Sequence, residues 1–243
     1  MLPRFYVPHL DIAVRETPVP SDEATHLTRV MRLGPGDEIA VFDGRGHEFR
    51  AKVTSAARGK VRIQLLEQIE SAPEARVPIT LVQSVLKGDK MDDVVRDATM
   101  MGVAAIEPVV TARTIARVKR TENDRWARVA VASAKQCRRA VVPAIAATRS
   151  FGDWLATSAH GLRLMLVEPS AADAEILSLH VLENHAAGSL ALIVGPEGGW
   201  SPEERAQADA AGCMAVTLGG LTLRADAVAV AAVAIARFAL RDL

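Results

Sequence analysis

The residues with the clearest potential for chemistry lie in a glycine-rich loop between an apolar run and a capped helix. Residues 193–204 read IVGPEGGWSPEE. Glycines allow the backbone to turn sharply and to approach a ligand closely, and the unpaired N–H groups of such a loop and of a helix start bind polar ligand atoms. The pattern indicates either a nucleotide or cofactor site in an α/β sheet or a tight strand-to-helix turn. It matches neither a P-loop nor the G-x-G-x-x-G fingerprint.

Two further strand ends carry a related signal. Residues 218–227 read LGGLTLRADA, which again combines an apolar run, a glycine-containing loop and the start of a helix. Residues 164–170 read LMLVEPS, where an apolar run ends in Glu168-Pro169. Because ligands bind at the carboxyl ends of parallel strands, these loops can form one crevice.

Basic residues are concentrated in the middle of the chain, although 29 basic and 29 acidic residues give zero net charge. Residues 76–150 hold 14 basic and 7 acidic residues, and residues 151–243 hold 5 and 11. In a helix over 122–140, Arg125, Arg128, Lys135 and Arg139 would share an arc of about 80°. This stripe either follows a phosphate backbone or is a solvated helix face. The basic residues concerned are Arg113, Arg117, Lys119, Arg120, Arg125, Arg128, Lys135, Arg138 and Arg139.

The first part of the chain, to about residue 72, is predicted to be rich in β-structure. Three runs with many β-branched residues, 38–44, 47–55 and 60–67, are separated by short glycine-containing turns. Close turns join antiparallel strands, so a small barrel-like module is expected. Residues 21–32 precede it as a short helix with Ser21 as N-cap, and residues 70–78 are interpreted as a linker.

Beyond residue 78, strands and helices are predicted to alternate. Such alternation is typical of a mostly parallel sheet with both faces covered. Ser201, Pro202 and Glu204 supply the N-cap, first-position proline and capping-box acid of one helix. The expected strands are 79–86, 105–110, 163–168, 190–195 and 214–218, and the expected helices are 89–102, one beginning near 122, 201–212 and 225–240.

Composition excludes several classes of protein. With 49% hydrophobic and 24% charged residues, the chain is typical of a globular protein of one or two domains. Cys137 and Cys213 form no C-x-x-C pair, and no histidines have metal-ligand spacing, so neither a disulfide scaffold nor a metal site is expected. The most apolar run, 227–236, is too short to cross a membrane. Without a signal-peptide pattern, a cytoplasmic protein is expected.

Taken together, the segments are similar to those of the SPOUT methyltransferases, and within them to the small-subunit rRNA uridine-N3 methyltransferase family (RsmE). Their order and spacing carry the resemblance more than any single motif. The segments are HLTRVMRLGPGDEIAVFDGRG, KGDKMDDVVRDATMMGVAAIEPVVTART, AKQCRRAVVPAI, LIVGPEGGWSPEE and LGGLTLRADA. The resemblance implies an α/β fold with a deep trefoil knot over 73–243 and a PUA-like RNA-binding β-barrel over 1–72.

The resemblance also implies S-adenosylmethionine as cofactor, 16S rRNA of the small ribosomal subunit as partner, and a homodimer that binds RNA across both subunits. It implies neither a metal nor a membrane. The expected cofactor residues are Val167, Glu168, Gly195, Pro196, Glu197, Gly198, Gly199, Leu218, Gly219, Leu221 and Leu223. The expected RNA contacts are Arg29, Arg32, Arg113, Arg125, Arg128 and Lys135.

The implied reaction is methylation at N3 of a uridine, whose N–H is weakly acidic. A cation near O2 or O4 would stabilise the anion left when the proton departs. Arg138, Arg139 and Arg224 are the candidates for this role and for phosphate contacts. Glu197 either orients substrate or cofactor, acts as base, or caps loop N–H groups as a buried carboxylate. These four are the predicted catalytic residues.

Several positions depart from the family pattern. Leu221, Asp226 and Ala227 replace an arginine, a glutamate and a threonine of the last loop. Met100 and Lys135 each replace a glutamate. The departures leave two alternatives open: a non-catalytic rRNA-binding or assembly factor on this fold, or a SPOUT enzyme for another RNA position.

Overall fold

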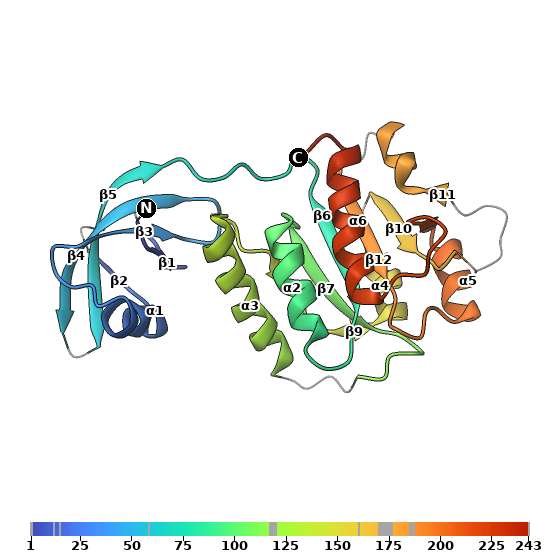
Figure 1. Cartoon of the computed structure of the whole chain (residues 1–243), viewed down its shortest axis with the longest axis horizontal. Helices are drawn as coiled ribbons and strands as arrows, with labels where there is room; N and C mark the ends of the chain where they lie inside the picture. The colour runs from blue at the N-terminus through green and yellow to red at the C-terminus, as the bar shows by residue number, and fades with distance from the viewer. Residues whose placement is uncertain are drawn as a thin grey trace. The chain divides into compact units, whose positions relative to one another are not determined.

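The computed structural model consists of two compact units, and Figure 1 labels their helices and strands. The N-terminal unit comprises Met1–Glu74 and Val131–Val142, and the C-terminal unit comprises Ala75–Ala130 and Pro143–Leu243. Residues 131–142, assigned to the second domain from the sequence, thus pack with the N-terminal unit. The structure describes residues 2–11, 13–14, 16–57, 59–116, 121–159, 161–169, 177–184 and 188–242.

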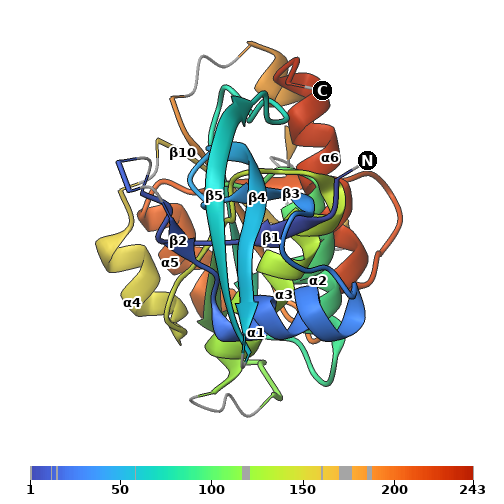
Figure 2. The same cartoon turned by 90° about the vertical axis from the view of Figure 1, so that its left-hand side faces the viewer.

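The N-terminal unit is built on a five-stranded sheet in the order β1-β3-β4-β5-β2. β1 runs parallel to β3, and the remaining neighbours are antiparallel. Figure 2 shows the long β4 and β5 side by side, and two register shifts between them bend the strands. The three strands predicted between residues 38 and 67 are therefore confirmed. The bounds are β1 Arg4–Tyr6, β2 Thr17–Pro18, β3 Glu38–Phe42, β4 Glu48–Ala57 and β5 Lys60–Ile69.

The short helix of this unit is present, but the N-cap predicted for it is wrong. α1 spans Ser21–Thr25 and continues as a π-helical turn over His26–Val30. Pro20 occupies the N-cap position and no side chain caps the helix. Ser21 is already the first helical residue, so its hydroxyl lies one position beyond the place from which an N-cap side chain acts.

The C-terminal unit is built on an eight-stranded sheet in the order β11-β13-β10-β12-β6-β7-β8, with β9 also paired to β7. All of the pairs are parallel. Every residue of the central strands β6 and β12 is buried, as expected for a sheet covered on both faces. The bounds are β6 Ile79–Ser84, β7 Ala105–Val110, β8 Ala144–Ile145, β9 Arg149–Ser150, β10 Leu162–Leu166, β11 Leu177–Ser178, β12 Leu190–Val194 and β13 Met214–Thr217.

Helices cover both faces of this sheet. α2 (Lys90–Met100) and α6 (Ala225–Ala239) pack together on one face, with a 3₁₀ helix (Leu179–Asn184) beside α6 (Figure 1). α4 (Phe151–Thr157) and α5 (Pro202–Ala210) form the other layer. Trp154, Val82 and Ile193 meet in the core beneath them. The predicted α/β layering is thus confirmed, whereas α4 was not anticipated; the trefoil knot stays a prediction.

The basic helix α3 (Glu122–Cys137) begins at the predicted residue but ends earlier than expected. Arg138 has φ = 68°, in the left-handed region, and this ends the helix. The expected cationic arc is therefore wrong for Arg139, which lies beyond the helix. Arg117, Lys119 and Arg120 fall outside the described residues. Among the described helices, none is both long and apolar enough to span a bilayer.

Candidate active site

A cavity of about 500 Å³ lies in the C-terminal unit at the carboxyl ends of β10, β12 and β13. Its lining starts with the last residue of each of these strands and continues into the three loops that follow them. The structure thus brings together the three strand ends singled out in the sequence. The charged residues in the lining are Lys90, Arg113, Glu168, Glu197, Arg205 and Arg224.

The second loop of the cavity depends on a glycine at its first position. A Cβ atom on Gly195 would lie 2.9 Å from Cε2 and 3.0 Å from Nε1 of Trp200, so the ring and the loop backbone are in close contact. The Trp200 indole N–H donates to the Leu166 carbonyl at 2.9 Å. This hydrogen bond attaches the loop to the end of β10. Gly199, at φ = 69°, then closes a tight turn by donating to the Pro196 carbonyl at 3.0 Å.

A capping box fixes the end of the same loop, as predicted. The Glu204 backbone N–H donates to Ser201 Oγ at 3.2 Å, and the Ser201 N–H donates to Glu204 Oε2 at 3.1 Å. Oε1 of the buried Glu204 also accepts from the Ala112 N–H at 2.8 Å. Arg113 Nη1 donates to the Gly198 carbonyl at 2.9 Å. The turn that follows β7 is therefore joined to the glycine-rich loop at two points, and Arg113 lies at the cavity wall.

Glu197 is held by a cation that the sequence analysis did not select. Lys90 Nζ donates to Glu197 Oε1 at 2.8 Å, and the Lys87 N–H approaches the same oxygen at 3.4 Å. Burial by itself would raise the pKa of Glu197, but the hydrogen bonds and the charge of Lys90 outweigh it and lower the pKa. Glu197 is therefore ionised at neutral pH. A carboxylate of lowered pKa holds a transferred proton poorly, which favours an orienting role over that of a base.

The third loop contributes apolar side chains at the cavity. Leu221 is 80% exposed and Leu223 is 41% exposed, although both line the cavity. Arg224 Nε donates to Asp226 Oδ1 at 3.2 Å. Exposed leucines at a concave site suit contact with an apolar or flat part of a ligand.

Nearly the whole predicted cofactor set lines this cavity. The exception is Gly219, whose carbonyl accepts from Thr217 Oγ1 at 3.1 Å and whose φ of 122° is readily adopted only by glycine. Lys90 and Arg205 line the cavity but were missed. Lys90 follows β6, the neighbour of β12, so the strand-end rule could have found it. The predicted residues that line the cavity are Val167, Glu168, Gly195, Pro196, Glu197, Gly198, Gly199, Leu218, Leu221 and Leu223.

The four predicted catalytic residues belong to two different units. Glu197 and Arg224 line the cavity of the C-terminal unit, whereas Arg138 and Arg139 belong to the N-terminal unit. Arg139 is buried, and its Nε donates to Glu74 Oε1 at 3.0 Å. Arg138 is exposed.

Two of the predicted RNA contacts are engaged in ion pairs within their own units. Lys135 Nζ donates to both carboxylate oxygens of the buried Glu23, at 2.8 and 2.7 Å. Arg125 pairs with Asp89 at 2.8 Å and with Asp92. The other predicted contacts are exposed, namely Arg29, Arg32, Arg113 and Arg128. Over the described ranges, no group of three histidine, cysteine, aspartate or glutamate side chains is arranged to hold a metal ion.

Comparison with family models gives two matches along the chain. Residues 73–237 match the RNA methyltransferase domain, and residues 19–66 match the RNA methyltransferase PUA domain. The first match alone covers more than half of the chain.

Individual relatives show the same relationship. A protein of Mycobacterium bovis named ribosomal RNA small subunit methyltransferase E is 35% identical over 246 residues, covering 95% of this chain and 90% of the relative. The Synechocystis protein of that name is 32% identical over 200 residues, which cover 82% of this chain but 65% of the relative. A crystal structure of the Neisseria gonorrhoeae protein of that name, bound to S-adenosyl methionine, has a TM-score of 0.86 at 30% identity and covers 98% of both chains.

Proposed function

Since this chain belongs to the RNA methyltransferase family that carries a PUA domain, we propose that it methylates N3 of a uridine in small-subunit rRNA, with S-adenosylmethionine as methyl donor. The observation that carries this proposal is the cavity formed by three loops at one edge of a parallel sheet. The names of the relatives support the class of substrate, and the resemblance in the chain's own segments supports the atom that is methylated.

The residues of the cavity fit this cofactor. The glycine-rich loop has its backbone at the surface of the cavity, and the absence of a side chain at Gly195 lets that backbone pack directly against the Trp200 ring. Loop N–H and C=O groups would hold the polar edge of the adenine, and Val167, Leu221 and Leu223 would contact its faces. The nearby charges of both signs suit an amino acid moiety, which carries an ammonium and a carboxylate.

The proposed mechanism assigns positioning and electrostatics to the protein. When bound, S-adenosylmethionine would supply a methyl group whose carbon a nucleophile attacks in line with the S–CH₃ bond, with the sulfur leaving as a neutral thioether. The chain must therefore hold the uracil N3 in line with that bond and exclude water. Arg224 is the predicted catalytic cation that lines the cavity, and Lys90 and Arg113 line it too. They would stabilise the uracil anion that remains after the N3 proton has passed to solvent.

Glu197 has a supporting role in this mechanism. Because its pKa is lowered, it stays ionised and keeps the Lys90 ammonium at the cavity wall. We assign it the orientation of Lys90 rather than the removal of the N3 proton. N3 lies on the Watson–Crick edge of the base, so the target uridine must be unpaired or flipped out of its stack.

A deletion strain tests the proposed function. Nucleoside mass spectrometry of its small-subunit rRNA should show loss of 3-methyluridine, and complementation with the wild-type gene should restore it. Calorimetry on the purified protein should show binding of S-adenosylmethionine. An unchanged 3-methyluridine level with intact cofactor binding would contradict the assigned position and point to another RNA site. Binding of rRNA without turnover on any rRNA substrate would favour the assembly factor.

We propose that the protein acts in the cytoplasm as a homodimer. The exposed face of α6 supports a partner surface, because Phe238 is 73% exposed and Ile235 lies one turn away at 41%. Light scattering at micromolar concentration should give twice the chain mass. A mass equal to one chain would remove the proposal that RNA binds across two subunits.

A further inference from the structure

An arginine occupies the position where helix α3 ends in a left-handed conformation. Arg138 has φ = 68° and follows the last helical residue, Cys137. Glycine is the usual residue at such a position, because a side chain makes this conformation less favourable. Non-glycine residues held in this region need support from their surroundings, and they are concentrated at functional sites. The left-handed conformation at Arg138 therefore needs contacts that hold the turn in place.

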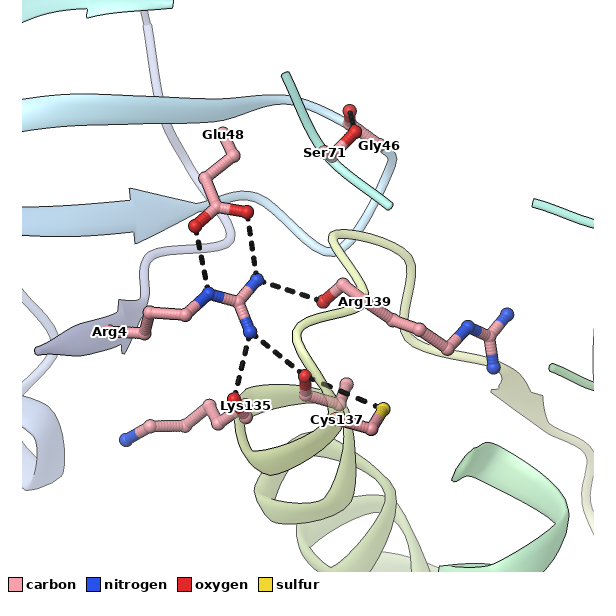
Figure 3. Close-up of polar contacts among 8 residues, drawn as sticks. Arg4, Gly46, Glu48, Ser71, Lys135, Cys137 and Arg139 are labelled. Carbon is pink, nitrogen blue, oxygen red and sulfur yellow. Dashed lines mark hydrogen bonds and ion pairs between the residues drawn. The ribbon is translucent and has the colours of Figure 1, made fainter. Parts of the chain in front are cut away.

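Arg4 holds the turn between Lys135 and Arg139 (Figure 3). Its Nη1 donates to the carbonyls of Ala134 and Lys135 at 3.0 and 2.9 Å, and its Nη2 donates to the Arg139 carbonyl at 3.1 Å. Nε and Nη2 also pair with the Glu48 carboxylate at 2.8 and 3.0 Å. All five N–H donors of the guanidinium are thereby used. Three backbone carbonyls around the end of α3 are thus fixed by one buried side chain.

The loop between β3 and β4 fixes the other side of the same turn. The Gly46 N–H donates to the Ala140 carbonyl at 3.1 Å, and the Val142 N–H donates to the Gly44 carbonyl at 3.0 Å. Arg139 points away from Arg4 in Figure 3 and pairs with Glu74. The chain on the C-terminal side of Arg138 therefore has further anchors besides the hydrogen bond from Arg4 to the Arg139 carbonyl.

The cations around this turn differ in whether they are neutralised. Arg4 pairs with Glu48, Lys135 with Glu23 and Arg139 with Glu74. Arg138 is exposed, and no carboxylate within the described part of the chain forms an ion pair with it. The positive charge that this turn offers to solvent is therefore that of Arg138.

We propose that Arg138 contacts a phosphate of the RNA substrate, and that Arg4 is the positioning residue that keeps Arg138 in its left-handed conformation. This inference rests on the proposed function, because it takes rRNA as the ligand. An arginine presents a planar set of donors that matches a phosphate. A preformed turn lets that side chain bind without ordering the backbone at the moment of contact.

The chain offers a matched pair of variants for the first half of the proposal. Arg241 also has a left-handed φ, 55°, and lies just beyond the end of helix α6. Arg138→Gly and Arg241→Gly therefore remove the same side chain from the same kind of helix end. Glycine relieves the backbone at both positions, so neither variant should be less stable than wild type.

The measurement is binding to transcribed small-subunit rRNA as a function of salt concentration. Arg138→Gly should bind about five- to tenfold more weakly, and the slope of log K against log salt should fall by about 1. Arg241→Gly should match wild type in both. Affinity for S-adenosylmethionine should be unchanged in both variants. Wild-type affinity and slope in Arg138→Gly would overturn the proposal.

A second pair of variants tests the positioning role of Arg4. The double variant Arg4→Met/Glu48→Met removes the buried charges together and leaves no unpaired carboxylate, whereas Arg4→Lys keeps a cation beside Glu48 but cannot reach all three carbonyls. In both variants the slope of log K against log salt should fall by the same amount as in Arg138→Gly, although the buried Arg4 side chain cannot contact RNA itself. A merely structural Arg4 would leave the slope of a folded variant at its wild-type value, and that result would overturn the positioning role.

The outcomes separate this inference from the function on which it rests. If the wild-type protein neither binds nor methylates small-subunit rRNA, the proposed function fails. If wild type binds and methylates rRNA while Arg138→Gly retains its affinity and salt slope, only this inference fails.

Discussion

The two units of the molecule use charge in opposite ways. In the N-terminal unit, the acids Glu23, Glu48 and Glu74 neutralise the cations Lys135, Arg4 and Arg139 in ion pairs that hold the end of α3. In the C-terminal unit, the cavity is shaped by glycine backbone and apolar side chains, and its charged groups stand at the wall.

The difference shows that a basic segment of sequence is not the same as a positive surface. Residues 76–150 hold twice as many basic as acidic residues, yet the acids that neutralise Lys135 and Arg139 come from the first 74 residues. Ion pairs between distant parts of the chain neutralise basic residues that a charge count over one segment treats as unpaired. Arg138 shows the opposite case, because its neighbours are neutralised and it is not.

The largest effect is expected at the buried ion pair of the N-terminal unit. Arg4→Met should lower the free energy of unfolding by about 3–5 kcal/mol, because it leaves the buried Glu48 carboxylate without its partner. Arg4→Met/Glu48→Met should regain most of that loss, since no charge then remains unpaired. Urea unfolding measures both. Equal stability of the single and the double variant would show that the carbonyl contacts of Arg4, rather than its charge pair, stabilise this unit.

Much of the fold could be predicted because local pattern and tertiary structure agree. The apolar runs of β6 and β12 are short and fully buried, and the Ser201 capping box sits at a helix start. α4 was missed because its seven residues, FGDWLAT, include a glycine and are too few for a helical period. β1 was missed because it has only three residues and becomes a strand by pairing with β3, which is distant in the sequence.

The residues that line the cavity were easier to predict than the ion-pair partners of the basic residues. Loops at the carboxyl ends of neighbouring parallel strands share an edge, so topology predicts that the three loops meet, and the family resemblance assigns their residues to the cofactor. No such rule says which acid reaches Lys135, or that α3 ends one residue before Arg138. Both depend on contacts across more than a hundred residues, such as Lys135 with Glu23. Lys90 was missed because it is the first residue of α2 and lies beyond the end of β6, where no glycine-rich pattern marks a site.

An intermediate effect is expected where the C-terminal unit relies on backbone. Gly195→Ala places a Cβ about 3 Å from the Trp200 ring, and overpacking of this kind costs about 1–3 kcal/mol. The loop must shift away from the ring, which changes the cavity surface, so affinity for S-adenosylmethionine should fall roughly tenfold in calorimetry. Gly152→Ala in α4 is the control, because its Cβ meets open space and should leave the affinity unchanged. Wild-type affinity in Gly195→Ala would show that the cofactor does not depend on the shape of this loop.

The smallest effect is expected at Asp43, whose carboxylate organises the loop between β3 and β4 through hydrogen bonds and an ion pair with Arg45. Burial would raise the pKa of Asp43, but hydrogen bonds from the His47 ring, from the Arg45 side chain and from both backbone N–H groups outweigh it and lower the pKa. A lowered folded-state pKa stabilises the protein above the unfolded-state value, near pH 4, and that stabilisation is lost as the pH falls through the folded-state value.

Asp43→Asn removes this titration while keeping an oxygen that can accept the backbone hydrogen bonds. The variant should therefore be slightly less stable than wild type at pH 7, and the difference should shrink between pH 5 and pH 3 in urea unfolding. A difference that stays constant over this range would show that Asp43 acts through the shape of the loop rather than its charge. In that case the loop between β3 and β4 would depend on backbone shape, as the cavity of the C-terminal unit does. The use of neutralised charges that distinguishes the N-terminal unit would then be confined to the end of α3.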